Sequence, residues 1–342
     1  MRAASMFWRQ VNLRVIGFLI TAVCLLVAAF CVDWQQTIAL LAAADRQTIA
    51  WAVLFLIATF YTFALRQRAL IAVEHPPPAW RIFNILMIGY LSNAVLPARP
   101  GDIIRAVLLR QIWGIRLSIA LASIVLERVF DILALCALGA TASFISQLPP
   151  LVVKGLFSLS AAGCGLLIAL IVLCWRRDLI GRAMQRFPDL FRHAFARFFA
   201  EWLQRFASAL NLINAPYRLI ASIVLTVAGW SALTLSMMML MQAFRLEVPP
   251  AAALLVLVAT NLGAVIPSSP GSLGVYHVMA VLALSAWGVE PSTALAFAIA
   301  SHVIAIGLHI MLGLGSAWFE GIGMFGLRGL VRGELGATQQ GS

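Results

Sequence analysis

The sequence predicts an all-α polytopic membrane protein with about six full spans and two re-entrant hairpins that proline and glycine break. Of its 342 residues, 62% are hydrophobic and 11% are charged, and the mean hydropathy is +0.96. A soluble domain carries about 25% charged residues. Apolar runs of about 17–25 residues, the length that spans a bilayer, recur along the chain. A proline- and glycine-containing motif occurs twice, each time within an apolar run.

The repeated motif has the pattern A-V-[L/I]-P-x-x-P-G and lies at residues 94–101 and 264–271. Proline and glycine interrupt helical hydrogen bonding, and irregular backbone at membrane depth is tolerated where it is buried in protein or lines a wet cavity. Paired breaks in two halves of a chain are typical of a transporter's substrate site. The residues expected to form these breaks are Pro97, Pro100, Gly101, Pro267, Pro270, Gly271 and Gly274.

The positive-inside rule sets the path of the first spans. Three arginines precede the apolar run 15–32, which is longer than the apolar region of a signal peptide and therefore predicts a retained span. The nearly neutral loop 33–47 is expected outside. A second span over 48–65 then returns to a basic flank that begins with Arg66 and Arg68.

The next apolar run ends in the first break, so residues 82–113 are predicted to form a hairpin that enters and leaves on the cytoplasmic side. A full crossing would translocate Arg110 and Arg116, whereas the hairpin keeps both inside. A span over 117–146 then leads out, and a span over 151–175 returns.

Residues 176–218 hold eight arginines and give the strongest inside signal. Aromatic residues at helical spacing between them predict a basic amphipathic helix in the headgroup plane, or one packed beneath the bundle. A span over 219–243 leads out, the second hairpin over 251–288 enters from outside, and a span over 292–319 returns. Both termini are then cytoplasmic, residues 1–342 form one integral membrane domain, and the two hairpins form an inverted repeat.

Three ionisable residues lie in the span over 117–146. Glu127 and Asp131 are four residues apart on one helix face, and Arg128 is three residues from Asp131. Charges within a membrane are costly and usually functional. The set is either an ion pair that fixes helix packing, or it leaves one carboxylate to carry a proton or to pair with an arginine elsewhere.

Arg99, Asp102 and Arg105 flank the first break. The planar guanidinium suits phosphate, which favours a headgroup contact for both arginines. Two alternatives stay open: Arg105 pairs with Asp102, or Arg99 reaches the interface along its apolar stem. The second break is polar and uncharged, and His302 and His309 are expected to face inward together. The predicted substrate-binding residues are Arg99, Arg105, Glu127, Arg128, Asp131, Asn93, Asn261, Ser268, Ser269, Tyr276 and His277.

Other binding chemistries are not expected. The five cysteines lie in or beside apolar runs without metal-ligand spacing, so they are interpreted as small core residues. No phosphate-binding loop of the G-x-x-x-x-G-K-[S/T] type is present. The net charge of +11 comes mainly from residues that flank spans, which favours contact with anionic headgroups at the cytoplasmic face rather than nucleic acid. No cofactor, metal or catalytic residue is predicted.

Three ordered blocks carry a family resemblance: Asn93-x₃-Pro97-x-Arg99-x-Gly101-Asp102-x₂-Arg105, Glu127-Arg128-x₂-Asp131 and Pro267-x₂-Pro270-Gly271-x₂-Gly274-Val275. Over residues 10–325 the chain resembles the transmembrane flippase domain of lysylphosphatidylglycerol synthases and their stand-alone relatives. The resemblance implies movement of a lipid, often with a modified headgroup, between leaflets. We expect no aminoacyl-transferring domain here, and His277 stands where many relatives have an acidic residue.

The expected function is therefore that of a lipid flippase or facilitator in the bacterial inner membrane. Its lipid would bear a phosphate, as a phospholipid or a polyprenyl-phosphate-type lipid does. Two alternatives are an intramembrane transferase or hydrolase with Glu127 or Asp131 as base, and a scaffold for a lipid biosynthetic enzyme.

Overall fold

The computed structural model describes residues 33–71, 73–96, 99–146, 154–155, 158, 161, 165, 216–264 and 270–322. All regular secondary structure within these residues is helical. Three of the helices are long and apolar enough to cross a membrane: α3 (Arg46–Leu70), α10 (Pro216–Ala243) and α13 (Pro291–Phe319). The predicted all-α polytopic membrane fold is confirmed. The predictions outside the described residues are the span over 15–32, most of 151–175 and of the basic segment 176–218, and Pro97, Pro267, Ser268 and Ser269.

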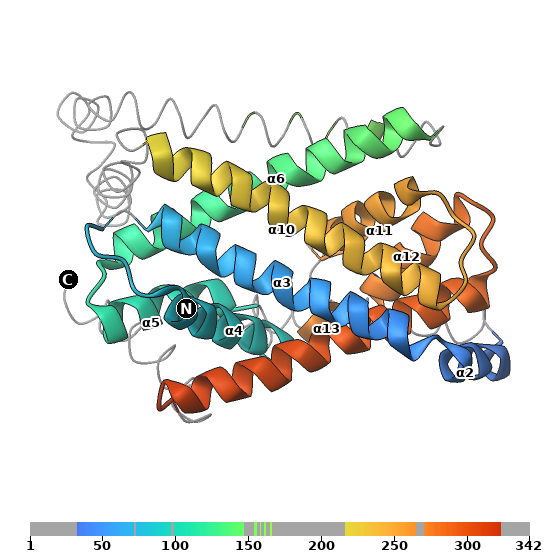
Figure 1. Ribbon diagram of the computed structural model, residues 1–342, viewed down its shortest axis with the longest axis horizontal. Coiled ribbons are helices and arrows are strands. Elements are labelled where there is room, and N and C mark those ends of the chain that lie inside the picture. Colours follow the sequence, from blue (N-terminus) through green and yellow to red (C-terminus); the bar gives the residue numbers. More distant parts are fainter. Residues whose placement is uncertain are drawn as a thin grey trace, which may run out of the picture.

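Helices α3 and α10 form an antiparallel pair along one side of the bundle (Figure 1). At one end the amide of Asp45 donates to the carbonyl of Ala243 at 3.2 Å. At the other end the Arg218 guanidinium donates to the carbonyls of Ile71 and Val73, at 3.0 and 2.9 Å. We call these two ends of the bundle the Asp45 end and the Arg218 end.

Two helical hairpins enter the bundle from opposite ends (Figure 1). The first consists of α4 (Ala79–Val95) and α5 (Gly101–Trp113) and comes from the Arg218 end. The second consists of α11 (Pro250–Gly263), the 3-10 turn η2 (Pro270–Ser272) and α12 (Val275–Ser285), and comes from the Asp45 end. Helix α4 contacts η2, so the two breaks meet inside the bundle.

The helices that follow the hairpins complete the repeat. Helix α6 (Leu117–Ile145) follows α5, α13 follows α12, and both have 29 residues. Helix α4 packs on α13, and its counterpart α11 packs on α6, the counterpart of α13. The same packing therefore recurs when the two halves are exchanged, and α3 and α10 pack against each other beside them.

Glycines allow the first hairpin to pack closely. A Cβ atom on Gly101 would lie 2.2 Å from the carbonyl oxygen of Gly89, and one on Gly313 of α13 would lie 2.5 Å from the Cβ of Leu91 and 2.8 Å from the carbonyl oxygen of Met87. No side chain fits at such distances from backbone. Helix α4 therefore contacts both α5 and α13 through glycine.

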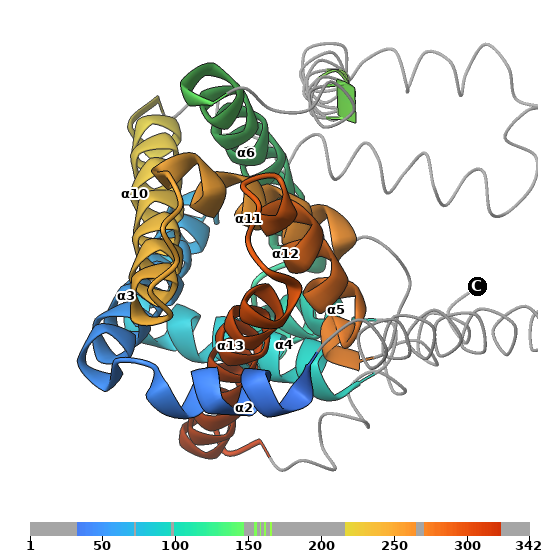
Figure 2. The same ribbon diagram turned by 90° about the vertical axis from the view of Figure 1, so that its right-hand side faces the viewer.

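Two sequence predictions are wrong in detail. Part of the loop expected over 33–47 is the helix α2 (Trp34–Ala43), which Asp33 caps by accepting from the amides of Gln35 and Gln36 at 2.9 and 3.1 Å. Ten residues are too short to span a bilayer, and α2 lies across the Asp45 end against α13 (Figure 2). The span expected over 48–65 extends to Leu70, so Arg66 lies within the helix rather than in its flank.

Candidate functional site

A cavity of about 350 Å³ lies between the two halves of the repeat. Helices α3, α4, α6, α10, α11, α12 and α13 all contribute to its wall, together with both breaks. Its aromatic lining comes from α3, α4, α10 and α12, and its charged lining comes from α6 and the first break. The charged residues that line it are Arg99, Arg128 and Asp131.

Arg99 joins the two breaks. It follows Ala98 in the first break, and its backbone has a φ of 49°. Its guanidinium donates to the carbonyl of Ala264 and to the hydroxyl of Ser272, both of which belong to the second hairpin. Among the residues that the structure describes, no carboxylate pairs with Arg99. Its positive charge is therefore held by neutral acceptors.

Arg105 and Glu127 form a buried ion pair between α5 and α6. Their side chains are 1% and 3% exposed, and Arg105 Nη2 donates to both carboxylate oxygens of Glu127, at 3.0 and 2.7 Å. Arg105 Nη1 also donates to Asp102 Oδ1 at 3.3 Å, the pairing that the sequence left open. The residues that line the cavity do not include Arg105 or Glu127, so a ligand contact of these two side chains stays a prediction.

The ion pairs continue from Asp102 to the cavity wall. Arg128 donates to Asp102 through a two-bonded fork, with Nε and Nη2 at 3.1 and 3.0 Å from its oxygens, and Arg128 Nη1 lies 3.4 Å from Asp131. The other oxygen of Asp131 accepts from Arg66 Nη1 at 2.7 Å and from the indole of Trp230 at 3.3 Å. Asp131 is thus linked to α3 and α10 as well as to its own helix.

These contacts form one continuous network of three arginines and three carboxylates, with a formal charge of zero. Its members are Arg66, Asp102, Arg105, Glu127, Arg128 and Asp131. A charge buried without a partner costs roughly several kcal/mol, so the buried members Arg66, Arg105 and Glu127 depend on their partners. Arg128 and Asp102 are 47% and 38% exposed and depend on theirs less. The network therefore fixes how α3, α5 and α6 pack, and it presents Arg128 and Asp131 to the cavity.

His277 and His302 connect the backbone of Gly274 to that of Gly271 in the second break through a series of hydrogen bonds. The Gly274 amide donates to His277 Nδ1 at 3.3 Å, His277 Nε2 lies 3.4 Å from His302 Nδ1, and His302 Nε2 lies 2.8 Å from the carbonyl oxygen of Gly271. Because a carbonyl only accepts and an amide only donates, the series is satisfied when both imidazoles are neutral with their protons on Nε2. Gly271 and Gly274, with φ of 70° and 83°, are held by this series.

Aromatic and amide groups complete the lining. The ring of Tyr276 stacks on His302, with centroids 4.5 Å apart, and its hydroxyl lies 3.0 Å from Ser301 Oγ. Asn93 Oδ1 accepts from the Gly101 amide at 2.8 Å, and Asn261 Nδ2 donates to the Leu257 carbonyl at 2.8 Å. Both residues line the cavity, and the other amide atom of each has no hydrogen-bond partner among the described residues.

Sequence reasoning missed several members of the site, among them the network residue Arg66 and the aromatic lining residues Phe60, Phe63, Tyr90 and Trp230. The sequence indicates that Arg66 lies in the flank of the second span, because the apolar run ends one residue before it. In the structure, Gln67 to Leu70 extend the helix by another turn. Trp230 gave no signal, because an indole in a membrane span is ordinary. Of the described residues, no three His, Cys, Asp or Glu side chains form a group that could hold a metal ion.

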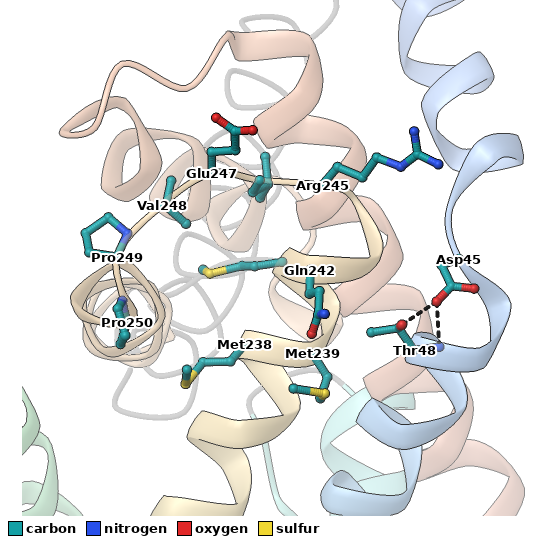
Figure 3. A pocket seen from close by; sticks show the side chains of 12 residues that line it. Asp45, Thr48, Met238, Met239, Gln242, Arg245, Glu247, Val248, Pro249 and Pro250 are labelled. Atoms are coloured by element: carbon teal, nitrogen blue, oxygen red, sulfur yellow. Dashed lines mark hydrogen bonds between the residues drawn. The ribbon is translucent and has the colours of Figure 1, made fainter.

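A second cavity, of about 620 Å³, lies at the Asp45 end, between the start of α3 and the loop from α10 to α11 (Figure 3). Among the residues that line this cavity, Asp45 caps α3. Hydrogen bonds from the Thr48 hydroxyl and amide hold the pKa of Asp45 below its usual range. Arg245 lies on its rim, is exposed, and has a φ of 53°, close to that of Arg99. Because Arg245 lies outside the first cavity, it offers a control position for Arg99.

Residues 14–313 match a known protein family, described as the lysylphosphatidylglycerol synthase TM region. The chain belongs to this family. A curated relative, glycosyltransferase AglD of Haloferax volcanii, is 24% identical over 352 residues, which cover 90% of this chain and 56% of the relative. The chain thus spans about half the length of that relative. No solved structure matches the chain. The resemblance to this family that three short motifs indicated is confirmed.

Proposed function

We propose that this protein moves a lipid with a phosphate-bearing headgroup between the leaflets of a bacterial inner membrane, as a flippase or facilitator. The observation that carries the proposal is Arg99, a cation held by neutral acceptors where two oppositely directed hairpins meet at a cavity. Paired broken helices at an internal repeat are where transporters bind their substrates. The family also fits a protein that handles lipids.

A phosphate would compete for Arg99 with its present partners. A phosphate attracts the guanidinium more strongly than the neutral carbonyl and hydroxyl do, because both partners are then charged, and the planar guanidinium can bind a phosphate through two bonds. A bound phosphate therefore draws Arg99 away from Ala264 and Ser272 and loosens the contact between the two breaks. Substrate binding is thereby coupled to separation of the hairpins.

The distribution of charge at the helix ends supports the proposed orientation. At the Arg218 end, the ends of α3, α4, α5 and α6 are basic, whereas the Asp45 end carries exposed or capping carboxylates. The positive-inside rule then puts the Arg218 end in the cytoplasm. The Arg218 end carries Arg68, Arg81, Arg110, Arg116 and Arg218 beside Glu74 and Glu320, and the Asp45 end carries Asp33, Asp45, Glu247 and Glu290 beside Arg46 and Arg245.

The enzyme alternative is disfavoured by the ion pairs. Glu127 and Asp131, the two candidate bases, each bind an arginine in the bundle, so a substrate would have to compete with that arginine for the carboxylate. The name of the relative AglD states a glycosyltransferase activity for that protein. Turnover of a lipid-linked sugar by the purified protein would support the enzyme alternative instead.

The proposal is tested by leaflet exchange in proteoliposomes that hold trace fluorescent phosphatidylglycerol, with a membrane-impermeant quencher outside. We expect exchange that depends on the protein. The Arg99→Gln variant should lose at least about tenfold in rate, and Arg99→Lys should lose less, because lysine keeps the charge but not the fork. Arg245→Gln is the matched control, since it removes one arginine from a similar backbone conformation, and it should exchange lipid normally.

Two results would contradict the proposal. Wild-type protein that is folded but gives no exchange above empty liposomes would leave a scaffold or an enzyme as the function. Arg99→Gln protein with the full rate would show that the phosphate does not bind at the first break.

A further inference from the structure

Two of the three charged residues that line the first cavity have a partner of opposite charge among the described residues, and the third, Arg99, has none there. Of its charged lining residues, Arg128 is paired with Asp102, and Asp131 is paired with Arg66. Arg99 has no carboxylate partner among the described residues. The wall that the structure describes therefore carries one formal positive charge in excess, which matches the single negative charge of a phosphodiester.

A cationic headgroup finds no free carboxylate there. Asp131 is the acidic residue among the described lining residues, and both of its oxygens are in use: one accepts from Arg66 and Trp230, and the other faces Arg128. An ammonium group could reach Asp131 only by displacing an arginine, and it would then lie near Arg99 and Arg128. Like charges in such a cavity repel.

Neutral polar groups, by contrast, have spare hydrogen-bonding capacity. Among the described residues, Asn93 Nδ2, Asn261 Oδ1 and the Tyr90 hydroxyl have no hydrogen-bond partner, and all three residues line the cavity. A hydroxyl group both donates and accepts, so one hydroxyl can bind an amide N–H and another an amide oxygen. Hydroxyl groups are therefore the chemistry that these three side chains can satisfy.

The remaining lining suits the carbon skeleton of a polyol. The rings of Phe60, Phe63, Tyr90 and Trp230 line the wall, and small-molecule sites combine such aromatic surfaces with a few polar groups. The volume of about 350 Å³ lies at the lower end of the range of roughly 300–1,000 Å³ for such sites. It accommodates a phosphate with one glycerol or one sugar ring.

We infer that the cavity selects lipids whose headgroup is an uncharged, hydroxyl-bearing group on a phosphodiester, such as a glycerol or a single hexose, and that it excludes lipids with a cationic headgroup. The inference rests on the proposed function for the phosphate at Arg99. It adds that the charge balance of the wall, with Asp131 held in the network and Arg99 in excess, sets the choice between uncharged and cationic headgroups.

The test measures binding, separately from exchange. Native mass spectrometry of the purified full chain compares dioleoyl lipids that differ only in headgroup: phosphatidylglycerol, phosphatidylethanolamine and lysyl-phosphatidylglycerol. A polyprenyl phosphodiester of one hexose is added as a fourth lipid. We expect the glycerol or the hexose lipid to bind at least about tenfold more tightly than either amine-bearing lipid, and the comparison of these two shows which hydroxyl-bearing group is preferred.

A charge variant sharpens the test. Asn261 lies one turn before Ala264, whose carbonyl binds Arg99, so Asn261→Asp adds a carboxylate near Arg99 and brings the wall to zero net charge. Its preference for phosphatidylglycerol over phosphatidylethanolamine should fall to within about twofold. Glu247→Gln, which changes one charge at the second cavity, should keep the wild-type preference. Thermal unfolding identifies variants that do not fold.

The outcomes separate this inference from the proposed function. Equal binding of all four lipids by the wild-type protein, or no binding of any, overturns the selectivity. A wild-type preference that Asn261→Asp leaves unchanged overturns its assignment to the cavity charge. A preference that persists in a protein that exchanges no lipid keeps the inference for binding and overturns only the flippase.

Discussion

At the residue scale, the most constrained group is the ion pair of Arg105 and Glu127. Both side chains are almost fully buried, so removal of either one leaves a charge in the bundle without its main partner. Asp102 cannot replace Glu127, because its carboxylate is already bound by the fork of Arg128. The pair therefore acts through packing.

We expect Arg105→Gln and Glu127→Gln each to lower the free energy of unfolding by about 3–5 kcal/mol, the usual cost of breaking a buried pair. The double variant should lose clearly less than the sum, because it leaves neither charge unpaired. Thermal or denaturant unfolding in detergent, followed by far-UV circular dichroism, measures the cycle. Additive losses would mean that the two residues do not interact in the folded protein.

At the scale of the element, α13 depends on one of its glycines. Gly313 lies against Leu91 and the backbone of α4, whereas a Cβ on Gly315, two residues further along the same helix, would meet no atom within 4 Å. The two positions share helical backbone and neighbouring sequence. They differ in the contact with α4, which makes them a matched pair.

Gly313→Ala should force α13 away from α4 and destabilise the protein by about 1–3 kcal/mol, the usual cost of overpacking. Gly315→Ala should have no such cost, and it should stabilise the helix by up to about 1 kcal/mol because alanine is the better helix former. The melting temperatures of the two purified variants test this. A lower melting temperature for Gly315→Ala than for Gly313→Ala would contradict the packing argument.

At the scale of the whole molecule, the inverted repeat fixes which parts face the same side of the membrane. The loop after α3 and the loop after α10 lie at opposite ends of the bundle (Figure 1). Glu74 and Glu247 are exposed in these loops. The two positions therefore report the orientation of the whole chain.

After replacement of the five native cysteines by serine, a cysteine at Glu247 should react with an impermeant maleimide added outside intact cells. A cysteine at Glu74 should react only after the cells are permeabilised. Wild-type exchange activity in the serine background is the control. Reaction at Glu74 from outside would reverse the proposed orientation.

Much of this architecture could be predicted from the sequence, because its signals are local. Two prolines and a glycine mark each break, and the spacing of Arg128 and Asp131 indicates an ion pair within one helix. The partners of these charges could not be predicted in the same way. Arg66 and Trp230 lie 65 and 99 residues from Asp131 in the chain, and Ser272 lies 173 residues from Arg99. Such contacts depend on how the helices pack.

The charge of Arg99, which pairs with no carboxylate in the part of the chain that the structure describes, has an electrical consequence. A membrane potential of 100 mV does about 2.3 kcal/mol of work on one elementary charge that crosses the whole bilayer. On the proposed mechanism, a hairpin tip that returns empty carries the charge of Arg99 through part of that field, whereas a tip that holds a phosphodiester is neutral. The membrane potential of the living cell, negative inside, then acts on the conformational change of the empty protein and draws its site toward the cytoplasm. The conformational change with a bound phosphodiester moves no net charge, so its rate does not depend on the membrane potential.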